Sequence, residues 1–185
     1  IIISLDMLKD EAVKNYLTIS KLNAKVFSKE LNQDISNIEK TMINISSIID
    51  LYSNDKEINN NLINSLHNYP QIRSINVLQN DKIIYSSNND NLGIFIRDIN
   101  LFPEAIFDKT ILKISKPWIG RDFSTGKETS LYQEKINYKE SSFIPISKKI
   151  ISKKGEYNVI VNLNSDYFIN RFQSHIDGNN IIFEL

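Results

Sequence analysis

The sequence predicts an α+β fold in which one long N-terminal helix precedes a five-stranded antiparallel sheet. The first observation is a run from Leu5 to about Tyr52 that contains no Gly or Pro and is rich in helix-compatible residues. The second is a set of short β-rich runs separated by turn residues, which is typical of antiparallel strands. The third is the segment Asn164-Ser165-Asp166, whose side chains can cap a helix after the last strand.

The long N-terminal run carries two apolar stripes with heptad spacing. The stripe of the second half consists of Leu31, Ile35, Ile38, Met42, Ile45, Ile49 and Tyr52. The additional apolar residues Ile43, Ile48 and Leu51 widen it enough to cover a sheet. The stripe of the first half is narrower, has another phase and consists of Leu5, Leu8, Ala12, Ile19, Leu22 and Val26. We expect one helix, roughly 70 Å long at about 1.5 Å per residue, that serves first as a stalk or dimer contact and then as sheet cover. Two helices with a bend near Ser28 are the alternative.

A second helix and a hairpin are expected to follow. Asn54 can cap a helix over 54–68, and Tyr69-Pro70 ends it. Strands over 74–79 and 82–87 are then joined by a turn at Asn80-Asp81. A polar loop follows these strands, with a short helix around 103–108.

Three further strands are expected over 112–116, 142–151 and 157–163. The last two are joined at the charged hairpin tip Lys153-Lys154-Gly155, and a helix over 165–176 leaves the sheet. A final strand is expected over 181–185.

Alternation along the strand at 157–163 assigns its two faces. Its apolar face should meet the long helix and consists of Tyr157, Val159, Val161 and Leu163. Asn162 lies on the opposite face, which should look toward the loop at 118–132. A polar residue there is expected to contact a ligand or to anchor the loop.

Composition excludes several classes of function. The 22 basic and 22 acidic residues cancel, so no large field points to nucleic acid. Cysteine is absent, which excludes disulfides and thiolate metal sites. No stretch of about 18 or more apolar residues is present that could span a membrane.

The sequence offers little support for catalysis. Its two histidines, His67 and His175, fall near expected helix ends, and the glycines at 93, 120 and 126 are too scattered to cradle a phosphate. No metal-ligand spacing of His and acidic residues occurs. We therefore expect a protein that is not an enzyme and needs no metal or cofactor.

The loop at 118–132 is the strongest candidate for binding. Trp118, the single tryptophan, precedes Arg121 and Tyr132, and an aromatic wall with a few polar groups is typical of a small-molecule pocket. Arginine offers a planar fork for a carboxylate. The alternative is that Trp118 fills the core while Arg121 anchors the loop backbone.

Three segments, PWIGRDFSTGK (117–127), IPISKKI (144–150) and NLNSDYF (162–168), resemble the Cache, or PAS-like, extracytoplasmic sensor domains of bacteria. The likeness begins at YPQIRSINVLQNDKIIYSSN (69–88) and is nearest to domains fused to diguanylate cyclases, histidine kinases or chemoreceptors. It implies a PAS-like central sheet and a ligand held between that sheet and the loop. The ligand-binding residues that we expect are Tyr85, Trp118, Arg121, Tyr132, Phe143, Ser147 and Asn162.

The sequence also departs from this family. Amino-acid-binding members carry an Asp where Asn162 stands, and Asn cannot neutralise an ammonium group. A stretch that often holds an Arg and a Tyr has Ile99 and Leu101 instead, and keeps only Phe102. An amino-acid ligand is therefore doubtful, and a carboxylate, another small metabolite or no ligand remain alternatives.

These observations lead to one expectation and one rival. We expect a stalk and cover helix (1–52), a sensor domain (53–178) and a strand that opens a second module (179–185). The domain would lie outside the cytoplasm in a membrane receptor, with membrane contact only through flanking helices. The rival is a scaffold with a degenerate pocket that forms a homodimer through the N-terminal helix.

Overall fold

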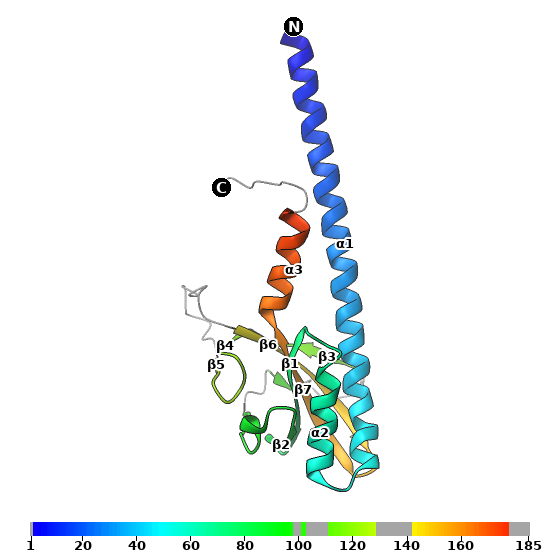
Figure 1. Ribbon diagram of the computed structural model, residues 1–185, viewed down its shortest axis with the longest axis vertical. Coiled ribbons are helices and arrows are strands. Elements are labelled where there is room, and N and C mark those ends of the chain that lie inside the picture. Colours follow the sequence, from blue (N-terminus) through cyan, green and yellow to red (C-terminus); the bar gives the residue numbers. More distant parts are fainter. Residues whose placement is uncertain (1, 98–100, 103–110, 129–141, 178–185) are drawn as a thin grey trace. The chain divides into compact units, whose positions relative to one another are not determined.

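The computed structural model describes residues 2–97, 101–102, 111–128 and 142–177. They divide into two compact units, Ile1–Ser36 with Asn170–Leu185 and Asn37–Ile169, which are described separately below. The short helix expected at 103–108 and the strand expected at 181–185 lie outside the described residues, as does Tyr132. The chain has the α+β fold that was expected, with a long N-terminal helix and an antiparallel sheet (Figure 1).

Helix α1 spans Ile2–Leu51 without a break, so the alternative of two helices separated near Ser28 is wrong. In the stripe predicted for its second half, the side chains of Ile38, Met42, Ile45 and Ile49 are all fully inaccessible. The expectation that Ile43 and Leu51 widen this stripe over the sheet is wrong, because both side chains are exposed. In contrast, every described side chain from Met7 to Ile19 is exposed. None of the helices, over the described residues, is long and apolar enough to cross a lipid bilayer.

The sheet of the second unit is antiparallel throughout. Its strands are β1 (Ile72–Gln79), β2 (Lys82–Ser86), β3 (Leu112–Ile114), β4 (Trp118–Ile119), β5 (Lys127–Glu128), β6 (Ser142–Ser152) and β7 (Gly155–Asn164). They are ordered β2-β1-β7-β6-β4-β5, and β3 also pairs with β6. The five expected strands are present as β1, β2, β3, β6 and β7. The short strands β4 and β5 lie within a segment that was expected to be a loop.

Local sequence explains the breaks and turns of this sheet. Asn80 and Asp81 have φ values of 51° and 62°, as a two-residue hairpin turn with the right twist requires. Strands β3 and β4 both pair with β6 but are separated at Pro117, which has no backbone N–H to donate to a ladder. Together they form one interrupted row beside β6.

The two faces of the sheet bury different kinds of side chain. On one face the partners Val77 and Val159, and Ile146 and Val161, lie opposite each other. Lys148 on this face pairs with Glu39 of α1 at 2.8 Å, so the second half of α1 lies over it, as predicted. Helix α2 (Asp55–Leu66) packs beside it on β1 and β2.

The opposite face carries the loop-side core. This core consists of Leu78, Ile83, Ile96, Leu101, Phe123, Phe143 and Ile160. The same face also carries buried polar side chains, among them Ser74, Asn76 and Asn162. An apolar cluster beside a buried polar cluster on one face is the feature that positions the candidate site.

The first unit contains the beginning of α1 and the end of α3 (Ser165–Asp177). Phe27 and Phe172 meet edge to face with ring centroids 5.1 Å apart. Arg171 pairs with Asp34 at 3.0 Å and with Glu30 at 3.2 Å. Burial raises the pKa of Asp34 above its usual value, which outweighs the opposing charge of Arg171.

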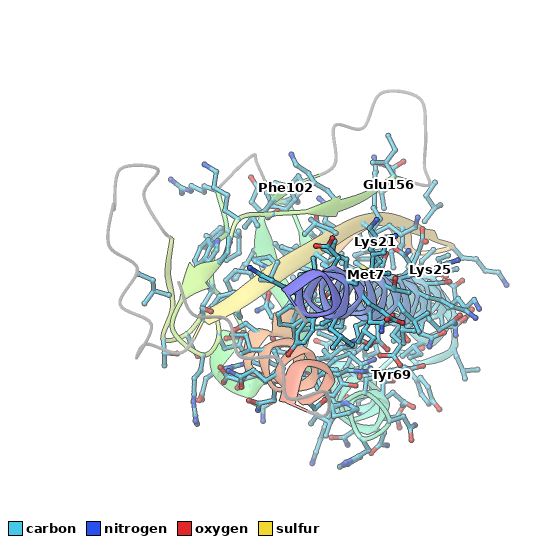
Figure 2. All side chains as sticks on the ribbon, turned by 90° about the horizontal axis from the view of Figure 1, so that it is seen from above. Met7, Lys21, Lys25, Tyr69, Phe102 and Glu156 are labelled. Atoms are coloured by element: carbon cyan, nitrogen blue, oxygen red, sulfur yellow. The ribbon has the colours of Figure 1, made fainter. Side chains whose placement is uncertain are left out.

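Figure 2 shows α1 approximately along its axis, with side chains of this unit that point away from the helix into solvent. Met7, Lys21 and Lys25 are exposed. In this unit α3 therefore contacts α1 at Phe27, Glu30 and Asp34, whereas the described side chains from Met7 to Ile19 are exposed.

Candidate functional site

Two glycines bring the loop between β4 and β5 back onto the sheet. Gly120 has φ +109°, and a Cβ there would lie 2.7 Å from Gly126 Cα. A Cβ on Gly126 would lie 2.6 Å from the carbonyl oxygen of Asp122 and 2.8 Å from the Phe143 ring. Only glycine fits so close a backbone approach. The residues between them, Asp122 and Phe123, are thereby turned inward and buried.

The side chain of Asp122 is held by four hydrogen-bond donors. Its Oδ1 accepts from Ser74 Oγ at 2.9 Å, from Asn162 Nδ2 at 2.7 Å and from the N–H of Phe123 at 2.8 Å. Its Oδ2 accepts from Asn88 Nδ2 at 2.9 Å. We call these four donor groups the Asp122 cage. All four are neutral, and among the described residues no cation contacts the Asp122 carboxylate, so hydrogen bonds stabilise it there.

A second layer of side chains orients the cage. Asn76 Nδ2 donates to Ser74 Oγ at 3.0 Å, and Asn76 Oδ1 accepts from Ser86 Oγ at 2.7 Å and from Asn91 Nδ2 at 3.0 Å. Because Ser74 Oγ already accepts from Asn76, its hydroxyl proton is directed at Asp122. Hydrogen bonds aligned in one direction in this way reinforce one another.

Asn162 has one polar atom that the cage does not satisfy. Its Nδ2 donates to Asp122 and also to Ser74 at 3.2 Å, and the residue is fully buried. Its Oδ1 has no hydrogen-bond partner among the described residues. The amide cannot be turned round, because Oδ1 would then face the carboxylate of Asp122. A buried acceptor without a donor is costly.

Trp118 lies in an aromatic cluster beside this polar site. Its ring is 5.1 Å from Phe123, edge to face, and 5.8 Å from Phe143, and those two rings are 5.3 Å apart. Trp118 is partly buried against the loop-side core. Trp118 thus packs against the core, as the alternative interpretation expects. It does not line the hollow at the loop, which lies beside Asp122.

That hollow is open, has a volume of about 380 Å³ and is lined by Arg73, Asn88, Arg121, Asp122, Asn164 and Asp166. We call it the Arg121 hollow. Its wall is tied together by Arg73, whose Nη2 lies 2.7 Å from Asp166 Oδ2 and whose Nε donates to Asn164 Oδ1 at 3.1 Å. Arg121 is exposed, and its guanidinium has no described hydrogen-bond or ion-pair partner. Asp166 lies in the first turn of α3, so the hollow touches the exit helix.

The predicted site residues are distributed over three places. Arg121 lines the hollow and Asn162 lies behind it, on the face toward the loop as expected from strand alternation. Phe143 and Ser147 are fully buried on this face, and Ser147 donates to the carbonyl of Leu101. Tyr132 lies outside the described residues.

Tyr85 is separated from the others because it lies on the helix-covered face, opposite Val77. Burial raises the pKa of its phenol, and the nearby Asp55 at the start of α2 raises it further. Its neighbours are therefore α2 and Tyr157, not the loop.

Sequence reasoning missed Arg73, Ser74 and Asn88. It placed Asp122 in the candidate loop but not among the ligand-binding residues. The run I-R-S-I-N-V places Ser74 and Asn76 at alternate positions of strand β1, so both lie on one face, which is a signal of polar function there. Asp122 gave no such signal, because its contacts are with residues 34 to 48 positions away.

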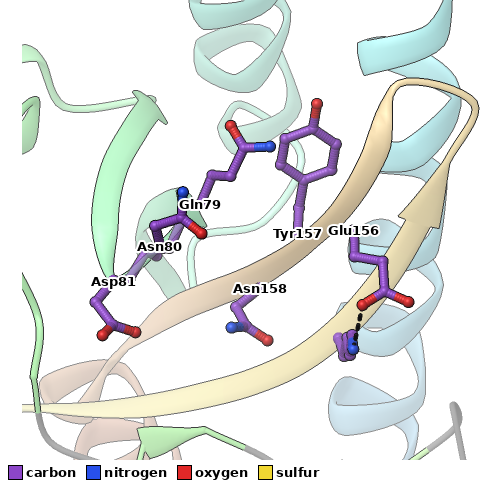
Figure 3. Close-up of a pocket in the computed structure, with 8 residues that line it drawn as sticks. Gln79, Asn80, Asp81, Glu156, Tyr157 and Asn158 are labelled. Carbon is purple, nitrogen blue, oxygen red and sulfur yellow. Dashed lines mark ion pairs between the residues drawn. The ribbon is translucent and has the colours of Figure 1, made fainter.

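A second hollow of about 320 Å³ lies at the hairpin end of the sheet, beside the Asn80-Asp81 turn (Figure 3). It is lined by polar residues, and its Lys149 and Glu156 form an ion pair at 2.5 Å. None of the predicted site residues lines it.

The fold is similar to that of a solved structure, the extracellular domain of rpHK1S-Z16, a candidate histidine kinase, with a TM-score of 0.59 at 16% sequence identity. The match covers 78% of this chain and 56% of the other, so the chain spans just over half of that neighbour's length. At this identity the likeness shows a shared fold. No protein-family model and no curated protein matches the sequence.

Proposed function

We propose that this chain is the extracytoplasmic ligand-sensing domain of a bacterial transmembrane receptor of the Cache type. A small molecule binds between the sheet and the loop at 118–132. The observation that carries the proposal is the Arg121 hollow, which joins a guanidinium with no partner among the described residues to a buried polar cluster on the loop side of the sheet. The fold shared with an extracellular domain of a candidate histidine kinase supports it.

The hollow also offers a route for a signal. A ligand shifts a conformational equilibrium only by binding one state better than another. Arg73 links strand β1 to Asn164 at the end of β7 and to Asp166 in α3. A ligand that contacts Arg73 or Asp166 therefore changes the interactions that hold the first turn of the exit helix.

Thermal-shift screening tests the proposal. A ligand that binds only the native state raises the unfolding midpoint, and at a hundred times its dissociation constant it adds about 2.7 kcal/mol to the free energy of unfolding. Carboxylates, amines, purines and sugars are screened against the wild type, then against Arg121→Ala. We expect at least one compound to raise the unfolding midpoint of the wild type. Its affinity for Arg121→Ala should be at least tenfold lower, because a hydrogen bond to a charged group contributes about 1.5–3 kcal/mol.

The control is Arg97→Ala, which removes an exposed arginine that does not line the hollow. It should bind like the wild type. A complete absence of shifts across the four compound classes contradicts the proposal, as does a ligand whose affinity is the same in both arginine variants.

A dimerising scaffold is the second candidate, and one observation favours it. On the first half of α1 the apolar residues of the predicted heptad stripe are exposed, with Leu8 at 62%, Leu22 at 59% and Val26 at 39%. A stripe with this spacing is self-complementary between two parallel helices. Under this proposal a second copy of the chain covers it, and the two functions can coexist in one receptor.

A further inference from the structure

Three of the four donors of the Asp122 cage are held in place by elements other than the loop that carries Asp122. Ser74 and Asn162 are directly opposed on β1 and β7, and both are fully buried. Asn88 uses its Oδ1 to cap the short helix η1 (Asn89–Asn91), accepting from Asp90 N at 3.1 Å. Its Nδ2 is thereby turned toward the cage. Sheet pairing and helix capping thus fix three of the four donors.

The direction of the hydrogen bonds behind the cage favours an anion at the position of the Asp122 carboxylate. The chain of hydrogen bonds runs from Ser86 to Asn76 and from Asn76 to Ser74, and it ends on Asp122. Each donor in this chain points toward the carboxylate. Preorganised dipoles that are already aimed at a negative group bind it without reorganising.

The cage opens to solvent through the Arg121 hollow, because Asp122 and Asn88 line both. Arg121, which has no described partner, and Arg73 lie at this opening and attract anions. An external carboxylate therefore has a path to the three donors that stay in place, on Ser74, Asn88 and Asn162, once the loop leaves with Asp122 and the N–H of Phe123.

Asn162 Oδ1 is an additional hydrogen-bond acceptor to which Asp122 donates nothing. It is a buried acceptor without a donor among the described residues, next to the amide nitrogen that holds the carboxylate. A carboxylate that carries a hydroxyl on the neighbouring carbon brings such a donor. Formate and acetate do not.

From these contacts we propose that Asp122 is a built-in occupant of a site for small carboxylates, and that an external carboxylate takes its place when the loop at 120–126 withdraws. The inference rests on the proposed function and deepens it by naming the ligand class. Ligand binding and loop closure are then competing states of one site. A compound with a hydroxyl beside its carboxylate binds more tightly because Asn162 Oδ1 gains a donor.

Chemical rescue of Asp122→Ala tests this. The variant empties the cage, and its thermal unfolding is followed in sodium formate, acetate and glycolate against sodium chloride at equal ionic strength. The matched control is Asp166→Ala, which removes an exposed carboxylate from the same hollow and leaves the cage intact. A milder variant, Asp122→Asn, retains an acceptor oxygen and serves if the alanine variant does not fold.

We expect formate, acetate and glycolate to stabilise Asp122→Ala saturably, by roughly 3–5 °C at ten times the dissociation constant, with glycolate the tightest. Asp166→Ala should respond to them no more than to chloride. Asp122→Asn should show the same order with smaller shifts. If the carboxylates act no better than chloride on whichever cage variant folds, or act equally on Asp166→Ala, the inference is overturned.

The outcome separates this inference from the proposed function. If the wild type binds a metabolite in the hollow but no carboxylate rescues the cage variant, the carboxylate ligand class is wrong. The proposed sensor function then still stands. A rescued cage variant with no ligand for the wild type shows that the empty cage accepts a carboxylate, but it contradicts both the displacement of Asp122 and the sensor.

Discussion

Asp50 shows how a single side chain joins two elements of the sheet unit. Its carboxylate at the end of α1 accepts from Ser152 Oγ at 2.7 Å and from Lys153 N–H at 2.8 Å. The hydrogen bond from Ser152 lowers the pKa of Asp50, and the N–H and charge of Lys153 lower it further. The tip of the β6–β7 hairpin is thereby fixed to the helix that covers it.

The pKa of Asp50 predicts a pH dependence of stability. Because the folded-state pKa is below the unfolded-state value, the carboxylate stabilises the fold above about pH 4, the usual range for Asp, and this contribution is lost as the pH falls through the folded pKa. Asp50→Ala should therefore be less stable than the wild type at pH 7, and the difference should shrink on acidification below pH 4.

Urea unfolding followed by the fluorescence of Trp118 measures this, since the single tryptophan lies in the same unit. Asp10→Ala, which removes an exposed carboxylate of α1, is the control and should show no such convergence. A difference between Asp50→Ala and the wild type that is constant from pH 7 to pH 3 would contradict the assignment.

At the scale of elements, α1 has two halves with different environments. Its second half is buried over the sheet, whereas the outer stripe of its first half is exposed. We define the outer stripe as Leu8, Ala12, Asn15, Ile19, Leu22 and Val26. In a parallel dimer each of these residues meets its own copy, so Asn15 faces Asn15 and the two amides can hydrogen-bond. An antiparallel dimer would place Asn15 opposite an apolar residue.

Cysteine crosslinking tests this pairing, because the chain contains no cysteine of its own. We expect Ile19→Cys and Leu22→Cys to form disulfide-linked dimers under mild oxidation, since a disulfide requires closely approaching Cβ atoms. Leu17→Cys is the matched control, for Leu17 is 56% exposed but lies off the stripe. A non-reducing gel reads the result. Equal crosslinking at 17 and 22, or none at 19 and 22, would exclude the parallel dimer.

Elements with local signals could be predicted from the sequence. The glycine-free run gave α1, Asn80-Asp81 gave the first hairpin, and alternation along β7 assigned Asn162 to the loop side. Strands β4 and β5 could not be predicted, because two residues are too few to show a period. Their pairing depends on β6 and on the close approach of Gly120 and Gly126.

The candidate site was predictable only in part, for a physical reason. Arg121 and Asn162 were found from residue type and strand facing, whereas the carboxylate between them was not. The family resemblance implies an acidic residue at 162, and this chain has Asn there. The structure places the carboxylate of Asp122 against that Asn, so the acidic group comes from the loop instead of the strand. A contact of this kind depends on tertiary packing and leaves no local pattern.

For the whole molecule, the central claim is that a small ligand binds at the Arg121 hollow and not elsewhere on the sheet. The claim has an internal control, since the second hollow beside Asn80 and Asn158 has a comparable volume, about 320 Å³. The most direct measurement is a two-dimensional amide NMR spectrum of the ¹⁵N-labelled chain, titrated with the same carboxylates, amines, purines and sugars. We expect at least one compound to shift the backbone amides of the residues that line the Arg121 hollow. Shifts confined to the hollow beside Asn158, or none with any compound, would contradict the account.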